Sequence, residues 1–204
     1  MNQGMIVTEF GGLIRQELDI ESLLRTTLEF VLGRCGPTNA AVFLPTTSGD
    51  YSLGAYVNYD CPKETVDVLL DHLANTIAPR LAEGAVKALP GGRSGGGAGP
   101  VMHLKDHAAL IKALGEDAGW LGDSSVVGFP CTQEGECLAV FLLFRDRLTE
   151  FSPALVEQLR TIGELFAAQL ARVIRIHHRH IPKDQWGAIG DGEDEADDIG
   201  GMAA

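Results

Sequence analysis

The clearest information on the fold lies in the run Ser124-Ser-Val-Val-Gly-Phe-Pro-Cys131, a polar turn with Gly135, the run Leu138-Ala-Val-Phe-Leu-Leu-Phe144, and shortly afterwards Leu148-Thr-Glu-Phe-Ser-Pro153. Two apolar runs joined by a short turn predict a β-hairpin. The second run is apolar at nearly every position. A strand with one face in water would alternate apolar and polar residues, so this run needs cover on both faces. We therefore expect a sheet that lies between two other layers.

A long helix follows the hairpin. Ser152 is suited to the N-cap, and Pro153 to the first helical position. Apolar residues then recur at helical spacing as far as about His177: Leu155, Leu159, Ile162, Phe166, Leu170, Val173 and Ile174. At 1.5 Å per residue this helix reaches roughly 40 Å, which is longer than the sheet it covers. Its far end should therefore project or pair with another chain.

The chain upstream of the hairpin alternates between helical and strand patterns. Apolar stripes predict helices over residues 19–32, with Asp19 as N-cap, and over residues 62–77, which Pro79 should end or kink. Ile6, Phe10, Leu13 and Ile14 predict an earlier helix, although Gly11 and Gly12 cost about 1 kcal/mol each relative to Ala. Strands are expected over residues 40–44, 51–58 and 101–104, and a short helix from Asp106 to Leu114.

This order of elements, together with Pro130, Gly135 and the Phe151-Ser152 step in the closing stretch, resembles the GAF domain. The resemblance covers roughly residues 19–176. It implies an α+β fold in which the N- and C-terminal helices pack on one face of a central antiparallel sheet and a small-molecule pocket lies on the other. It also implies a sensory or regulatory role, and often pairing through the terminal helices. The Asn-Lys step of the cyclic-nucleotide-binding members is absent here, which argues against a cyclic nucleotide.

Composition excludes several classes of partner. The chain has 204 residues, enough for one domain with short appendages, and its net charge of −12 repels nucleic acids and anionic lipids. The longest apolar run, Leu138 to Phe144, is far too short to cross a bilayer, and no signal sequence is evident. We expect a soluble, cytoplasmic protein with neither a nucleic-acid nor a membrane partner.

Three segments follow from these patterns. Residues 1–18 form an N-terminal helical segment, residues 19–178 the GAF-like domain, and residues 179–204 a flexible tail that is first basic and then acidic. Within the domain, residues 90–100 read Pro-Gly-Gly-Arg-Ser-Gly-Gly-Gly-Ala-Gly-Pro, which predicts a mobile loop. This loop lacks the Lys-Ser/Thr ending of a phosphate-binding loop.

If a pocket exists, a few polar-capable groups among apolar walls should line it. The candidates come from the second strand, the loop and strand before the short helix, and the segment that enters the hairpin: Tyr56, Asn58, His103, Trp120 and Ser125. The alternative interpretation, that each is an ordinary core or surface residue, stays open for each of them.

Two other groups of residues suggest chemistry. Cys131 and Cys137 flank a turn of five residues, so a hairpin could bring them opposite each other as a redox pair, although buried cysteines are often inert. His177, His178 and His180 lie among arginines that oppose a metal ion, and a basic helix end complements the helix dipole, so no metal site is expected.

The tail holds six acids from Asp191 to Asp198. It is a solvated tail, or it folds back on the basic end of the long helix, with Trp186 as an anchor for that contact or for a partner protein.

Three functions remain open at this stage. The first is a non-enzymatic signalling or regulatory module, homodimeric through its terminal helices, that senses a small molecule or docks a partner. The second is a thiol redox enzyme or switch that uses Cys131 and Cys137. The third is a degenerate scaffold that binds no ligand.

Overall fold

The computed structural model describes residues 3–87 and 101–180. Its centre is an antiparallel sheet of five strands in the order β2-β1-β5-β4-β3. The strands are β1 (Asn39–Pro45), β2 (Tyr51–Val57), β3 (Met102–Leu104), β4 (Ser124–Gln133) and β5 (Glu136–Asp146). The predicted antiparallel α+β fold is confirmed.

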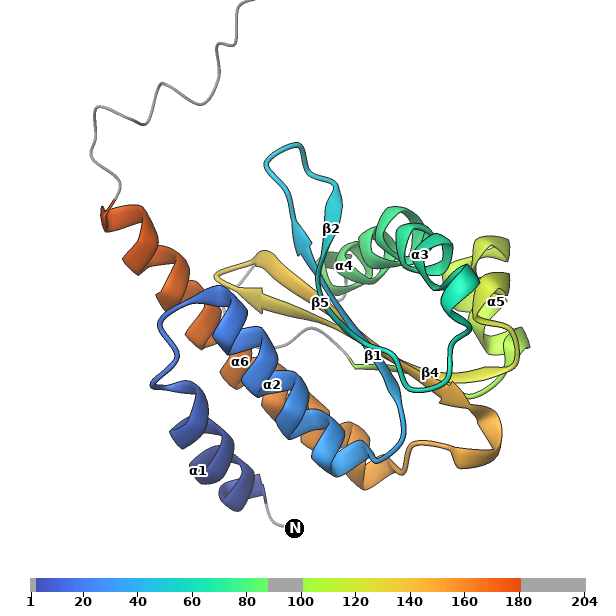
Figure 1. Ribbon diagram of the computed structural model, residues 1–204, viewed down its shortest axis with the longest axis horizontal. Coiled ribbons are helices and arrows are strands. Elements are labelled where there is room, and N and C mark those ends of the chain that lie inside the picture. Colours follow the sequence, from blue (N-terminus) through green and yellow to red (C-terminus); the bar gives the residue numbers. More distant parts are fainter. Residues whose placement is uncertain (1–2, 88–100, 181–204) are drawn as a thin grey trace, which may run out of the picture.

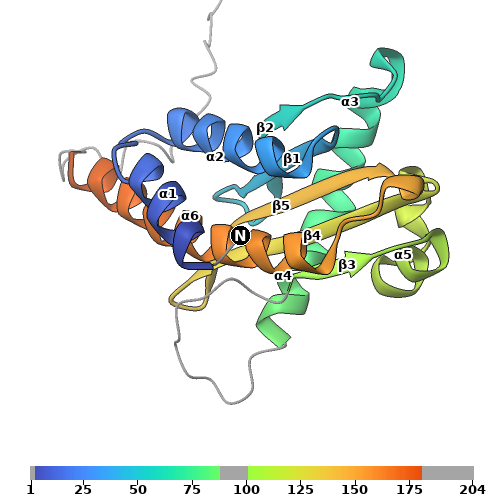
Figure 2. The same ribbon diagram turned by 90° about the horizontal axis from the view of Figure 1, so that it is seen from below.

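One face of the sheet is covered by the helices from the two ends of the described chain (Figures 1 and 2). α2 (Ile20–Cys35) and α6 (Pro153–His180) pack on the sheet, and α1 (Gln3–Ile14) packs on the outer side of these two helices. Phe141 and Phe129 stack on this face with their ring centroids 5.1 Å apart, and Phe166 of α6 meets Phe141 edge-on at 5.0 Å. The predicted packing of the terminal helices on one face is therefore confirmed.

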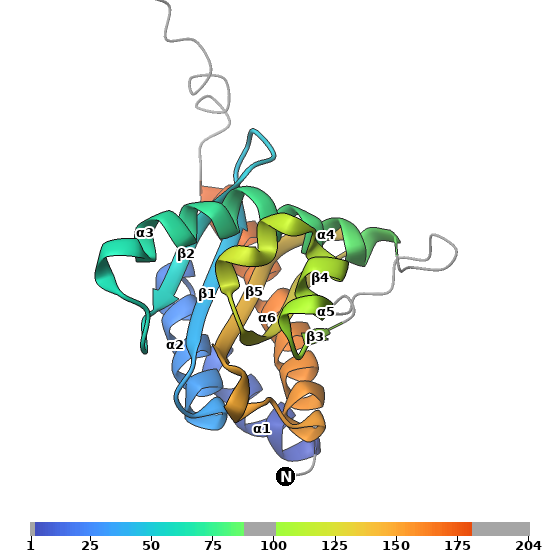
Figure 3. The same ribbon diagram turned by 90° about the vertical axis from the view of Figure 1, so that its right-hand side faces the viewer.

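The opposite face carries the second helical layer (Figure 3). It consists of α3 (Lys63–His72), a π-helical turn η1 (Leu73–Ile77), α4 (Ala78–Lys87), α5 (His107–Leu114) and a 3₁₀ helix η2 (Glu116–Leu121). A second 3₁₀ turn, η3 (Arg147–Thr149), links β5 to α6. Both faces of β4 and β5 are thus covered, as their apolar sequences predict.

Pro79 was expected to end or kink the helix, and the structure shows that the helical run continues past it. The chain passes from α3 through the π turn directly into α4, and the Ala78 amide donates to the carbonyl of Leu73, five residues back. Because α4 begins at Ala78, Pro79 lies in its first turn, where a proline without an N–H is tolerated. The wider turn is how this sequence accommodates a proline within a helical run.

The predicted helix starts are confirmed in atomic detail. The Asp19 carboxylate accepts from the Ser22 amide at 2.8 Å, and Asp106 accepts from Ala109 at 2.8 Å. The Ser152 hydroxyl accepts from the Leu155 amide at 3.2 Å. Each bond satisfies a helix N-terminal amide that has no partner within its helix.

Several predictions concern residues outside the described ranges. They include the glycine-rich loop 90–100, the tail from residue 181 onwards with Trp186 and Asp191 to Asp198, and the side chains of His178 and His180. In the ranges 3–87 and 101–180, none of the helices has the length and apolar character needed to cross a bilayer.

Candidate functional site

The face of the sheet beneath α3, α4 and α5 is filled with apolar side chains. Phe43, Leu73, Ile77, Leu110 and Leu114 are each at most 1% exposed and form one cluster with the sheet residues Val140 and Leu142. The packing is close enough that a Cβ on Gly128 would lie 2.8 Å from Leu81 Cδ1. The sheet face on which the family resemblance implies a ligand pocket therefore holds a packed core in this chain.

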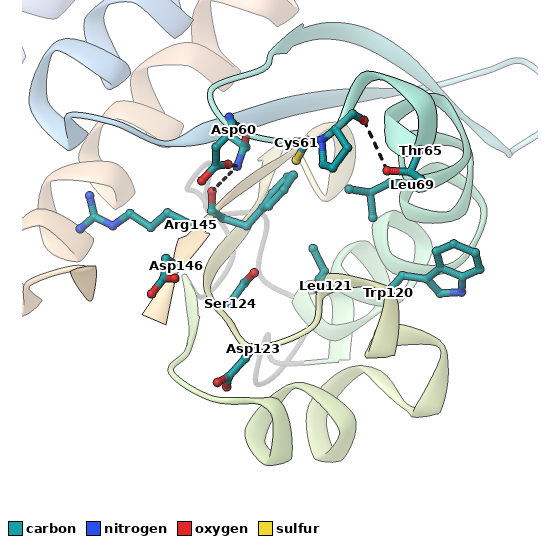
Figure 4. Close-up of a pocket in the computed structure, with 13 residues that line it drawn as sticks. Asp60, Cys61, Thr65, Leu69, Trp120, Leu121, Asp123, Ser124, Arg145 and Asp146 are labelled. Carbon is teal, nitrogen blue, oxygen red and sulfur yellow. Dashed lines mark hydrogen bonds between the residues drawn. The ribbon is translucent and has the colours of Figure 1, made fainter. Parts of the chain in front are cut away.

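A hollow of about 410 Å³ remains at one end of this layer, where β1 and β4 begin and β5 ends (Figure 4). We call it the end hollow. Ligand sites in proteins usually measure roughly 300–1,000 Å³. Its lining combines apolar, hydroxyl, thiol and carboxylate groups from Asn39, Asp60, Cys61, Pro62, Thr65, Leu69, Trp120, Leu121, Asp123, Ser124, Phe144, Arg145 and Asp146.

One wall of the end hollow is the loop between β2 and α3, and a buried amide fixes its shape. Asn39 is 2% exposed, and its Nδ2 donates to Asp60 Oδ1 at 2.6 Å and to the carbonyl of Phe144 at 3.3 Å. Its Oδ1 accepts from the amides of Tyr59 and Asp60 at 2.9 and 3.3 Å. The Asp60 carboxylate is therefore held at the edge of the hollow before any ligand arrives.

The charge around the end hollow is negative. Asp60, Asp123 and Asp146 stand at its rim, and Asp123 is paired with Arg147 at 3.0 Å. Arg145 is the single cation among the lining residues, and Figure 4 shows its side chain pointing away from the hollow. Because Arg147 neutralises only Asp123 and the Arg145 side chain points away, the rim keeps a net negative charge. A negative rim attracts cationic ligands and repels anions.

Arg145 instead connects the wall of the hollow to the terminal helices. Its Nη1 donates to the carbonyl of Cys35 at the end of α2 at 2.6 Å, and its Nη2 donates to the carbonyl of Glu150 before α6 at 2.8 Å. The guanidinium also lies 4.1 Å from the ring centroid of Phe151. One residue of β5 thus joins the end hollow, α2 and the start of α6.

The structure separates the five predicted pocket residues. Trp120 lines the end hollow, although the residue is 57% exposed and its ring lies tilted against that of His72, with the centroids 5.5 Å apart. Asn58 lies beside the hollow, where its side chain accepts from the Cys61 amide at 2.9 Å and so shapes the loop. Tyr56 packs into the core beneath the second helical layer, and its hydroxyl is buried.

His103 and Ser125 lie on the opposite face, towards α6. His103 meets Phe151 edge-on at 6.1 Å, and Ser125, which pairs in register with Arg145, is fully buried. The alternation of side chains along β3 and β4 directs them there, since Leu104 and Val126 face the other layer. The structure therefore does not bring the five predicted residues together.

The polar residues of the hollow that sequence analysis did not single out include Asn39, Asp60, Arg145 and Asp146. Asn39 and Asp146 directly flank apolar strand runs, and Ser124 opens another. Polar residues at the ends of predicted strands were the sequence signal that could have indicated this site.

The cysteines on the closing hairpin do not face each other. Cys131 pairs with Ala139, and Cys137 pairs with Thr132 next to a β-bulge. The expected turn of five residues is in fact a two-residue turn at Glu134 and Gly135, both with positive φ, which moves the register. Burial also raises the pKa of both thiols, which disfavours the reactive thiolate. The predicted opposition of Cys131 and Cys137 is wrong.

The chain has a GAF-like fold, as comparison with solved structures shows. The GAF domain of a GAF domain/HD domain protein from Geobacter sulfurreducens superposes with a TM-score of 0.59 at 13% identity, over 78% of this chain and 95% of that one. The GAF domains of phosphoenolpyruvate-protein phosphotransferases from Acinetobacter and Coxiella burnetii give TM-scores of 0.59 and 0.58 at 13% and 18% identity. They cover 86% and 87% of this chain, and 98% of each of those chains.

No protein-family model and no curated protein sequence matches the chain. The likeness to the solved structures therefore establishes the fold and leaves the function to be argued from the site.

Proposed function

We propose that this chain is a non-enzymatic regulatory module that reads a small molecule in the end hollow and reports it through its terminal helices. The proposal rests on the position of Arg145 between the end hollow and the terminal helices. Arg145 lines the hollow, and its side chain binds the end of α2 and the carbonyl of Glu150, which lies between η3 and α6. A ligand that moves the end of β5 acts on the helices that leave the sheet.

The mechanism is a population shift between two packings of these helices. A ligand changes that equilibrium only by as much as it prefers one packing. The loop held by Asn39 and the end of β5 are the parts of the wall that a ligand touches, and both are tied to the sheet by hydrogen bonds. Because the rim carries carboxylates, ligands with an ammonium group should bind better than carboxylates of the same shape.

A scaffold that docks a partner and binds no ligand is the second candidate. The packed core under α3 to α5 favours it, because the sheet face usually hollowed in this fold is filled by side chains such as Phe43, Leu73 and Leu142. Thiol redox chemistry is a weaker candidate, because Cys131 and Cys137 do not face each other.

We further propose that the module is a homodimer that pairs through α1 and the end of α6. α1 leaves Met5, Val7 and Leu13 between 45% and 54% exposed, which is unusual for three large apolar residues on one short helix. Nearby Leu18 is 54% exposed. A second copy of this surface would cover them.

Thermal unfolding of the purified protein with a panel of nucleotides, amino acids, amines, haem and bilins tests the ligand proposal. A ligand at about a hundred times its dissociation constant stabilises the fold by about 2.7 kcal/mol. Asp60→Asn, which keeps an acceptor for Asn39, should reduce the stabilisation by an ammonium ligand. The matched control is Glu164→Gln, an equal change of charge at an exposed position on α6. A panel in which no compound stabilises the protein would favour the scaffold instead.

A further inference from the structure

His103 lies at the junction between the edge of the sheet and the start of α6. It is the central residue of β3, and its ring meets the ring of Phe151 edge-on at a centroid distance of 6.1 Å. Phe151 is 2% exposed and directly precedes Ser152, the N-cap of α6. The contact between these two rings therefore helps to hold the first turn of α6 against the sheet.

The face of Phe151 is occupied by a second group. The Arg145 guanidinium lies 4.1 Å from the ring centroid and donates to the carbonyls of Glu150 and Cys35. The Phe151 ring thus contacts an imidazole and a guanidinium.

His103 occupies a site that is built for a neutral ring. Its Nε2 is buried and has no hydrogen-bond partner among residues 3–87 and 101–180. The same is true of Ser125 Oγ and Arg145 Nε, which follow on the same face of the neighbouring strands. The residue is half-buried, but protonation would place a second N–H at this buried nitrogen without an acceptor, which is unfavourable.

The charged groups that face His103 add to this preference. Lys105 follows directly after β3, Arg145 comes from β5, and Glu150 comes from the segment before α6, where it pairs with Lys105 at 3.7 Å. Burial, followed by the charge of Lys105, lowers the pKa of His103, and Arg145 acts in the same direction against Glu150.

We propose that His103 is a proton-responsive latch, which holds the start of α6 on the sheet while its ring is neutral and releases it when the ring is protonated. The input is a proton that binds at Nε2, and the output is the docking of α6, the helix that extends beyond the sheet in Figure 1. This goes beyond the reading of a small molecule, because it needs no ligand in the end hollow. The proposed ligand in the end hollow and the proton on His103 both act on the Glu150–Phe151 segment, which Arg145 contacts.

The expected pH dependence follows from the direction of the shift. Because folding lowers the pKa of His103 below its ordinary value of 6.5, the unfolded chain binds the proton more tightly than the folded chain. The stability that the neutral ring provides is complete above the unfolded pKa and is lost as the pH falls through the folded one.

Hydrogen exchange of the full chain at about pH 7.5 and about pH 5 tests the latch, with intrinsic exchange rates corrected for pH. The amides of Leu155 and Val156, which donate to Ser152 Oγ and to the Ser152 carbonyl, should lose protection by at least about threefold at the lower pH. Amides at the centre of β5 should keep theirs. NMR titration of the His103 ring should place its midpoint below that of an exposed histidine.

His103→Leu replaces the ring by an apolar side chain that does not titrate, and protection at Leu155 and Val156 should then be equal at the two pH values. His107→Gln is the matched control, since it removes an exposed histidine only a few residues away and should leave the pH response intact. Unchanged protection of the wild-type α6 start across this pH range would overturn the latch, as would an equal loss in His103→Leu. The wild-type measurement decides the matter even if that variant does not fold.

Discussion

Gly128 marks the place where α4 packs most closely on the sheet. The Gly128→Ala variant would place a Cβ 2.8 Å from Leu81 Cδ1 and 3.1 Å from its Cδ2, in a core where Leu81 is 3% exposed. Overpacking of this kind costs about 1–3 kcal/mol. We expect the free energy of unfolding, measured by urea titration, to fall by that amount.

A double-mutant cycle identifies the cause of that loss. In a Leu81→Ala background the added methyl group has space, so Gly128→Ala should cost much less than in the wild type. Equal costs in the two backgrounds would mean that Leu81 is not the obstacle. Gly119→Ala, at an exposed position where a Cβ meets no atom within 4 Å, serves as the control substitution.

The thiols give a second prediction at the residue scale. Burial raises the pKa of Cys35 to about 11 and raises that of Cys131 as well, whereas Cys61 is only half buried on the wall of the end hollow. In the folded protein Cys61 should react first with a thiol reagent, and Cys35 and Cys131 only on unfolding. Cys61→Ser should abolish the fast phase. Rapid formation of a disulfide between Cys131 and Cys137 would revive the redox proposal.

At the scale of elements, α1 contains two adjacent glycines near its C-terminal end that its packing does not require. An added Cβ at Gly11 or Gly12 meets no atom within 4 Å, and neither residue has a positive φ. Each Gly→Ala change should therefore stabilise the protein by up to about 1 kcal/mol. Gly36→Ala is the opposing control. Gly36 ends α2 with a φ of 70°, which alanine disfavours, so this substitution should destabilise the protein. Destabilisation by both α1 variants would mean that the helix packs differently.

Most elements could be predicted from the sequence because their signals are local. Helix starts could be predicted from residues that commonly act as N-caps, here Asp19, Asp106 and Ser152. The uninterrupted apolar run of β5 predicts that both faces of the sheet are covered. The turn at Glu134 and Gly135 was harder to predict from the sequence. Glu134 adopts a positive φ that its residue type disfavours, so the sequence suggested a longer turn and a different register.

The site was less predictable because it depends on how distant elements meet. The Asp60 carboxylate is held in place by the side-chain amide of Asn39, 21 positions away in the sequence. Arg145 reaches α2 by donating to the carbonyl of Cys35, 110 positions away. His103 was expected near a ligand pocket, yet the alternation of side chains along the short strand β3 directs it towards α6. Only the assembled sheet decides which face a three-residue strand presents to a pocket.

At the scale of the whole molecule, α6 has 28 residues and spans about 42 Å, and its last turns extend beyond the sheet in Figure 1. If α1 and this end of α6 form the dimer surface, sedimentation should show a dimer at micromolar concentration. Leu13→Glu should weaken it by placing a charge in the interface. Leu148→Glu, a similar change at a position 87% exposed on η3, should not. A wild-type monomer would remove the dimer proposal.

If the proposed function is right, a small molecule in the end hollow acts on the terminal helices through the end of β5. The most direct test is an NMR titration of the isotope-labelled full chain with the compound that stabilises it most in the thermal panel. We predict that amide shifts concentrate at residues 58–65, 121–124 and 144–146, with a second set at the start of α6. Shifts confined to other surfaces, or a panel without any binding compound, would contradict the claim.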